Sequence, residues 1–94
     1  MILDAGFLVS VDRGERVAQE FLTAALNRAT PLNTTHPVLA QVWRNGARQV
    51  RLTRLLNAIA IHAFDDGQTV GAILARSSTA DVVDAHLVSI AIRL

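Results

Sequence analysis

Thr79-Ala80-Asp81-Val82-Val83-Asp84-Ala85-His86 is the stretch that decides how the C-terminal part of this chain folds and what it offers chemically. It opens an apolar segment in which two carboxylates stand three residues apart. A helix would bring Asp81 and Asp84 to one face, one turn apart. We expect both to look along a buried stripe formed by Ala85, Val88, Ala91 and Ile92. A carboxylate beside a buried stripe is costly unless another group compensates its charge.

Length and composition indicate one folded domain. The chain has 94 residues, and 51% of them are hydrophobic, which argues for a core rather than disorder. Aromatic residues make up only 4%, so the core should consist mainly of Leu, Val, Ile and Ala. Such a core favours a layered α/β or a helical packing over a sandwich built on aromatic rings.

The composition also excludes several classes of protein. The chain has no cysteine, so disulfide scaffolds and thiolate metal sites are excluded, which fits a reducing compartment. Asp4 interrupts the N-terminal apolar run, so a signal peptide is not expected. No apolar run reaches the roughly 20 residues that span a bilayer. We therefore expect a soluble, cytoplasmic protein without a membrane partner.

Short apolar runs alternate with segments of helical periodicity. We expect strands at residues 1–3, 31–35 and 59–64, the last of them buried, and helices over 15–28, from Pro37 to about Trp43, 47–57, from about Asp65 to Arg76 and from Asp81 onward. Asp65 and Gln68 have capping-box spacing. Strands separated by helices predict a parallel α/β sheet. The chain ends in or just after the last helix, so we expect no further strand.

Asp4 is the first candidate site residue because it ends the first strand. Ligand groups in parallel α/β sheets lie just beyond the carboxyl ends of strands. The alternative is that Asp4 caps the following helix. We favour a site, because the apolar segment from Phe7 to Val11 begins only after Gly6.

The second acidic candidate is Asp84. Ser78 and Asp81 are in capping-box register, so Asp81 is equally well explained as a cap, whereas Asp84 lies on the apolar side beyond the expected first turn. Carboxylates from Asp4 and Asp84 would suit a hard cation such as Mg²⁺ or Mn²⁺, which can polarise a phosphoryl oxygen and activate water. The histidines lack zinc-site spacing, and no phosphate-binding glycine loop is present.

The basic residues are all arginine, although the formal net charge is only +1. Four of them, at positions 44, 48, 51 and 54, fall on one broad side of the expected helix. Arg44, Arg48 and Arg51 in particular are candidates for contact with RNA phosphates or an acidic partner peptide. A solvated helix face is the alternative. Trp43 is expected to belong to the core.

Three blocks of the chain, taken in order, resemble PIN-domain proteins, most closely small bacterial VapC-type toxins. They are Ile2–Gly6, Val38–Arg44 and Asp81–Val88. The resemblance implies a PIN-like three-layer fold, with a short parallel sheet flanked by helices, over the whole of residues 1–94. It also implies a Mg²⁺- or Mn²⁺-dependent ribonuclease that forms a homodimer and is inhibited by an antitoxin protein.

Carried onto this chain, the resemblance matches Asp4 to the first acid of the family and Asp84 to the third, with Asp81 as a neighbouring extra acid. Two positions depart from the pattern. Gln41 stands where the family usually has Glu, and the last strand with its further acid is missing, so the domain is shortened at its C-terminus relative to the family. Gln41 cannot bring a negative charge to a cation, but its amide can orient water.

The leading hypothesis is therefore a metal-dependent endoribonuclease, the toxin of a toxin–antitoxin pair. Asp4, Asp84 and Asp81 would hold the ion, and Gln41 would assist catalysis. The first alternative is a catalytically weakened or inactive PIN remnant that binds protein, either an antitoxin or its own dimer mate. The second is an unrelated small α/β module whose acids are helix caps.

Overall fold

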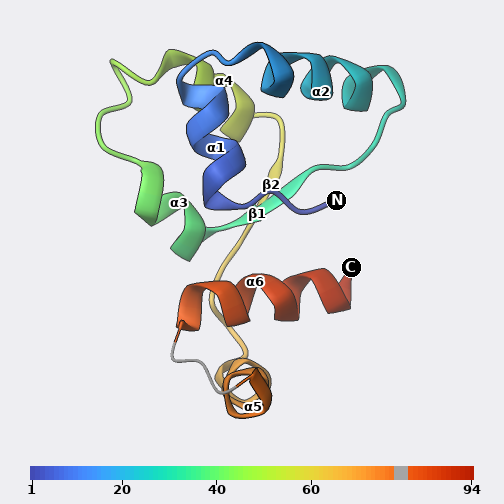
Figure 1. Ribbon diagram of the computed structural model, residues 1–94, viewed down its shortest axis with the longest axis vertical. Coiled ribbons are helices and arrows are strands. Elements are labelled where there is room, and N and C mark those ends of the chain that lie inside the picture. Colours follow the sequence, from blue (N-terminus) through green and yellow to red (C-terminus); the bar gives the residue numbers. More distant parts are fainter. Residues whose placement is uncertain (78–80) are drawn as a thin grey trace.

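Six helices and two short strands make up the residues that the structure, a computed structural model, describes: 1–77 and 81–94. In chain order they are α1 (Ala5–Asp12), α2 (Arg16–Asn27), β1 (Asn33–Thr35), α3 (His36–Val42), α4 (Val50–Leu56), β2 (Ala60–His62), α5 (Gly67–Ser77) and α6 (Val82–Arg93). The strands lie between α1, α2 and α4 on one side and the pair α5–α6 on the other, with α3 beside them (Figure 1). The expected α/β class is confirmed. In the described ranges no helix is long and apolar enough to cross a membrane.

The sheet is parallel, as expected, but smaller than expected. β1 and β2 pair with Asn33 opposite Ala60 and Thr35 opposite His62. The predicted N-terminal strand is reduced to one parallel bridge, between Ile2 and Asn33. Two of the three predicted strands are thus confirmed in shortened form, and the first contributes only a bridge.

Side-chain and backbone hydrogen bonds hold the N-terminus against β1. The Leu3 amide donates to the Asn33 carbonyl at 2.7 Å, and the buried Thr34 hydroxyl donates to the Leu3 carbonyl at 2.9 Å. The chain therefore runs parallel to β1 as far as Leu3. Asp4 and His36, which follow these two segments, leave the sheet at the same carboxyl edge.

β2 is not the buried strand that was predicted. Ala60 is exposed, and Ile61 and His62 are only half-buried. The reason is its position in the sheet: among the described residues β2 pairs only with β1, so its other side is an edge. An apolar, β-branched sequence is compatible with either position.

The core joins α1, α3 and α4. Leu8 and Leu52 are fully buried, and Val38 and Leu55 lie in the same apolar cluster. Leu52 and Leu55 lie three residues apart on α4 and therefore reach the core from the same side of the helix. Full burial of such side chains contributes about 1.5–3 kcal/mol each, so this cluster dominates the stability of the N-terminal part.

Trp43 does not belong to this core, contrary to prediction. Helix α3 ends at Val42, and Trp43 has an extended backbone with ψ of 129°. Its side chain therefore leaves the buried side of the helix, and 38% of its surface is exposed.

Helix α2 is confirmed nearly as predicted, but its apolar residues are largely exposed. Val17 and Leu26 are 79% and 70% exposed, whereas the two buried residues are Ala18 and Ala25. Small alanine side chains allow close packing of the helix, and Phe21 meets Phe7 of α1 edge-on, with 5.2 Å between ring centroids. The remaining apolar side of α2 faces outward.

Helix α5 begins one residue later than its predicted cap implies. Asp66, rather than Asp65, accepts from the Thr69 amide at 3.0 Å and from the Thr69 hydroxyl at 2.6 Å. Asp65 instead pairs with Arg93 near the end of α6, with 3.1 Å between Nη2 and Oδ1. Thr69 supplies two donors to Asp66, which explains why the cap falls there.

Candidate functional site at the carboxyl edge of the sheet

Asp4 caps helix α1, the alternative to the favoured site role. Its Oδ1 accepts from the Phe7 amide at 2.9 Å. The predicted gap after Gly6 is absent, because the helix begins at Ala5 and runs through the apolar segment. Asp4 is exposed and stands just beyond the bridged N-terminal segment, so it lies at the carboxyl edge as expected.

Asp81 caps helix α6, as one of the two interpretations of this residue predicted. Its Oδ1 accepts from the Asp84 amide at 3.1 Å. Ser78, its expected capping-box partner, and the first two residues of the stretch Thr79–His86 lie outside the described residues. Asp81 thus fixes the first turn of α6 by accepting a hydrogen bond from an amide within that turn.

Asp84 does not look along a buried stripe. It is exposed in the first turn of α6, and the buried positions of this helix are Ala85, His86, Ser89 and Ile90. Of the predicted stripe only Ala85 is buried, whereas Val88, Ala91 and Ile92 are exposed. The predicted stripe was therefore wrong: α6 buries a neighbouring face against α5 and the sheet edge.

The electrostatics of Asp84 connect all three acids. Its pKa is raised above 3.8, first by the negative charge of Asp81, then by partial loss of hydration, by a hydrogen bond with Asp81 and by the charge of Asp4. Asp4 and Asp84, 80 positions apart in the chain, thus lie within electrostatic range of each other. The structure brings the three predicted acids into one neighbourhood.

The acids form an open, solvent-facing arrangement. Among the described residues no group of three or more His, Cys, Asp or Glu side chains is close enough to hold a metal ion together. Mg²⁺ usually keeps several waters and binds through one or two carboxylates. The mutually repelling carboxylates of Asp81 and Asp84 have the donor chemistry for such an ion.

Buried His86 anchors the helix that carries Asp84. Its Nε2 donates a hydrogen bond to the Ala63 carbonyl oxygen at 3.1 Å, because a carbonyl oxygen can only accept. Its ring also lies 4.7 Å from that of Phe64. Ala63 directly follows β2, so His86 fixes α6 at the carboxyl end of that strand. The spacing of the histidines excludes a zinc site but gives no signal of this structural role.

Gln41 is exposed near the end of α3. The described residues contain no hydrogen bond that links its side chain to Asp4, Asp81 or Asp84. Helix α3 begins at the carboxyl edge with His36, and Gln41 lies more than one turn further along it. The structure brings the three acids together, and Gln41 stands on a helix that contacts α6.

The arginines do not share one helical face, contrary to prediction. Helix α4 begins only at Val50, so Arg44 and Arg48 precede it. Arg44 folds back on its own chain, with Nη1 donating to the carbonyls of Trp43 at 2.7 Å and Ala40 at 3.3 Å.

Gln49 explains why the helix starts late. Its buried side chain accepts from the amides of Arg44 at 2.8 Å and Asn45 at 2.9 Å, and donates to the Val42 carbonyl at 3.0 Å. These bonds hold residues 43–49 as a loop. A single Gln in a helical pattern gives no signal of such a role in the sequence.

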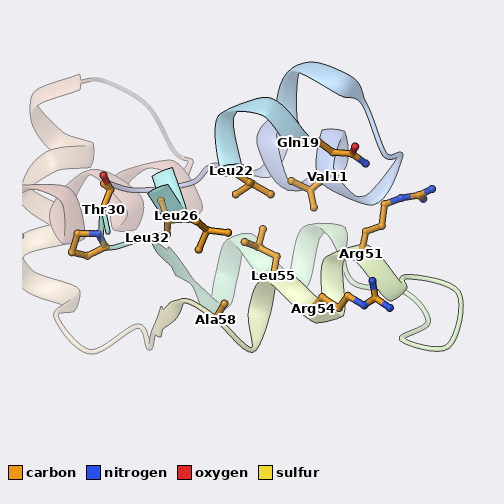
Figure 2. A pocket seen from close by; sticks show the side chains of 11 residues that line it. Val11, Gln19, Leu22, Leu26, Thr30, Leu32, Arg51, Arg54, Leu55 and Ala58 are labelled. Atoms are coloured by element: carbon orange, nitrogen blue, oxygen red, sulfur yellow. The ribbon is translucent and has the colours of Figure 1, made fainter. Parts of the chain in front are cut away.

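Arg51 and Arg54 border an apolar groove of about 350 Å³ between α2 and α4. Leu22, Leu26 and Leu55 converge on it, and Gln19, Arg51 and Arg54 lie together at one end (Figure 2). Arg51 also reaches the Asp12 carbonyl at 3.5 Å. The groove therefore combines an apolar floor with a basic end.

Comparison of the chain with family models, curated proteins and solved structures found no match.

Proposed function

We propose that this protein is a PIN-like, Mg²⁺- or Mn²⁺-dependent endoribonuclease that acts as the toxin of a toxin–antitoxin pair. The observation that carries the proposal is the gathering of Asp4, Asp81 and Asp84 at the carboxyl edge of the sheet, where Asp81 accepts from the Asp84 amide and the charges of Asp81 and Asp4 raise the pKa of Asp84. A divalent cation would relieve the mutual repulsion of these carboxylates at the carboxyl edge of the sheet. This supports a site for such an ion at the edge where α/β folds hold their ligands.

Asp84 and Asp81 are the proposed main ligands, with Asp4 contributing through a metal-bound water, because the three side chains are not close enough to bind one ion together. Asp4 and Asp81 each use Oδ1 in a helix cap, which fixes the position of each carboxylate. When bound, the ion would polarise a phosphoryl oxygen and activate a water molecule for phosphodiester hydrolysis. Gln41 would act only by orienting water, and the exposed Arg48 and Arg51 would attract the RNA backbone.

The test is cleavage of single-stranded RNA by the full chain with Mg²⁺, with Mn²⁺ and with a chelator. Asp4→Asn and Asp81→Asn are well-matched variants, because Asn caps helices as well as Asp does but carries no charge. Metal-dependent cleavage that falls in these variants and in Asp84→Asn supports the proposal. Cleavage that is unchanged in Asp4→Asn and Asp84→Asn contradicts it.

A second function, protein binding without catalysis, is favoured by the groove between α2 and α4. An amphipathic helix lays its apolar side into such grooves, and the basic end formed by Arg51 and Arg54 suits acidic residues on the partner. The antitoxin is the proposed partner. Exposed Val88 and Ile92 on α6 form a separate apolar surface for a dimer mate.

The protein-binding function is tested with a synthetic acidic amphipathic peptide, measured by titration calorimetry. Leu26→Glu should abolish binding, because Leu26 lines the groove. Val17→Glu is the matched control, since Val17 is an equally exposed residue of α2 that does not line the groove. Equal loss in both variants, or binding that persists in Leu26→Glu, contradicts the assignment.

A further inference from the structure

A second groove, of about 420 Å³, lies between α3 and α4 and contains the exposed Trp43. Side chains on successive turns of α3 form one wall of the groove, and side chains on successive turns of α4 form the other. The lining residues are His36, Leu39, Ala40 and Trp43 on the α3 side, and Thr53, Leu56 and Asn57 on the α4 side. The groove is thus mainly apolar, with an indole ring and a few polar groups.

The indole ring is held in place by the loop that follows it. A Cβ atom at Gly46 would lie 2.8 Å from Trp43 Cζ2 and 2.9 Å from Cη2, closer than real Cβ contacts. Only glycine therefore allows the ring to rest where it does. Because Gln49 fixes the same loop through its hydrogen bonds to residues 42–45, the ring is positioned before any ligand arrives.

The polar groups of this groove can bond to the edge of a planar heterocycle. His36 and Asn57 are exposed at its rim, and together they offer donors and an acceptor. The Thr53 hydroxyl is buried beside the ring and has no hydrogen-bond partner among the described residues. An apolar slot with an aromatic ring and a polar rim matches a nucleobase, which has a π-face and a hydrogen-bonding edge.

The groove begins near the acidic edge of the sheet, because His36 belongs to its lining. His36 is the first residue of α3 and directly follows β1, at the edge where Asp4 leaves its own segment. A single strand of RNA whose backbone passes the acids can therefore direct a base along α3 toward Trp43.

We propose that the groove between α3 and α4 is a nucleobase-binding pocket in which Trp43 stacks on an unpaired base of single-stranded RNA. The proposal rests on the proposed ribonuclease function and adds a substrate subsite to it. Trp43 is a positioning residue here, because it touches the substrate away from the bond that is cut. Its stacking would hold the strand in place and would tolerate different bases, since every base has a π-face.

Trp43 is the only tryptophan of the chain, and there is no tyrosine, so its fluorescence reports this pocket alone. A short single-stranded oligoribonucleotide is titrated into the full chain in the presence of a chelator, so that binding is measured without cleavage. We expect saturable quenching of Trp43. Trp43→Leu should weaken binding of a labelled oligoribonucleotide by roughly 5- to 150-fold, the usual range for loss of one base stack.

Phe21→Leu is the matched control, because Phe21 is as exposed as Trp43 (37% and 38%) but lies on α2. It should leave binding unchanged. Gly46→Ala, which displaces the ring without removing it, should weaken binding as well. Circular dichroism of each variant confirms that it folds, and Trp43→Phe, which keeps a smaller ring, should bind with intermediate affinity.

Oligoribonucleotide binding without any change in Trp43 fluorescence overturns the proposal, as does equal affinity for Trp43→Leu and the parent chain. Fluorescence that changes only with protein concentration also overturns it, because a second copy then covers the groove. Quenching by RNA without metal-dependent cleavage would leave the pocket in place and remove the nuclease. Cleavage that depends on Asp84 but not on Trp43 would support the nuclease and contradict the pocket.

Discussion

Asp66 and Asp84 stand at the starts of the two C-terminal helices, yet their surroundings shift their pKa values in opposite directions. The pKa of Asp66 is lowered, first by the hydrogen bond from the Thr69 hydroxyl and then by that from the Thr69 amide. The pKa of Asp84 is raised, first by the charge of Asp81. Neither carboxylate is deeply buried, so their neighbours cause the difference.

The two acids differ in how their surroundings affect the negative charge: it is favoured at Asp66 and disfavoured at Asp84. Asp66 is accounted for by capping, because its negative charge is favoured where it stands. Asp84 donates its backbone amide to the Asp81 cap, and the charges of Asp81 and Asp4 make the negative charge of its own carboxylate less favourable on balance. An acid held among like charges is typical of sites that bind cations or move protons.

The largest expected effect is on RNA cleavage. Asp84→Asn should lower the rate about 100-fold or more, because a metal ion supplies several kcal/mol of transition-state stabilisation and each 1.36 kcal/mol changes the rate tenfold. Asp66→Asn should leave the rate unchanged. Single-turnover cleavage with saturating Mg²⁺ measures both, and similar losses in the two variants would remove the distinction between the two acids.

The next effect concerns the stability of α6. Asp81→Ala should lower the free energy of unfolding by about 1 kcal/mol through loss of the cap, a shift of roughly 4–8 °C in melting temperature for a domain of this size. Asp81→Asn should retain most of that stability. Thermal unfolding followed by circular dichroism measures the difference; equal destabilisation by Ala and Asn would show that charge, rather than capping, is what Asp81 contributes.

A smaller effect is the dependence of stability on pH in Asp84→Asn. Because the pKa of Asp84 is raised in the folded state, the folded protein binds the proton more tightly, and stability falls as pH rises from 3.8 through the folded pKa. Asp84→Asn lacks this loss, so it should be more stable than the parent at neutral pH. The difference should vanish below pH 3.8, and a urea titration at several pH values detects it. A variant less stable than the parent at neutral pH contradicts this prediction.

Asp66→Asn should behave with the opposite sign. The lowered pKa means that Asp66 contributes stability above its unfolded value of 3.8, and this contribution is lost as pH falls through the folded pKa. The parent should therefore be more stable than Asp66→Asn at neutral pH, and the two should converge in acid. The same urea titrations test this, and convergence at neutral pH instead would exclude a favourable charge at Asp66.

The alternation of strands and helices could be predicted because it depends on local periodicity. The helical pattern placed α2 to within a residue at each end, and two of three strands form where short apolar runs predicted them. Which side of each helix is buried was less predictable. Val17 and Leu26 satisfy the pattern of a buried face, but the alanines of α2 pack instead, and no local rule selects between two such faces.

The candidate site was predictable as a set of residues but not as a set of contacts. Asp81 was recognised as a cap because the signal lies within four residues. Asp84 was wrongly expected beside a buried stripe, because the rotation of α6 is decided by tertiary contacts such as the bond from His86 to Ala63. The expected arginine face is absent because the hydrogen bonds of Gln49 hold residues 43–49 as a loop. Arg44 and Arg48 therefore lie outside helix α4.

The central claim is that Asp84 is held among like charges where a divalent cation can bind. The most direct test is a pH titration of the Asp84 side-chain carboxyl by NMR, without and with Mg²⁺. We expect a pKa above 3.8 for Asp84 in the metal-free protein, a lower pKa in Asp4→Asn, and a marked fall in the parent when Mg²⁺ is added. An ordinary pKa that Mg²⁺ does not change would contradict it.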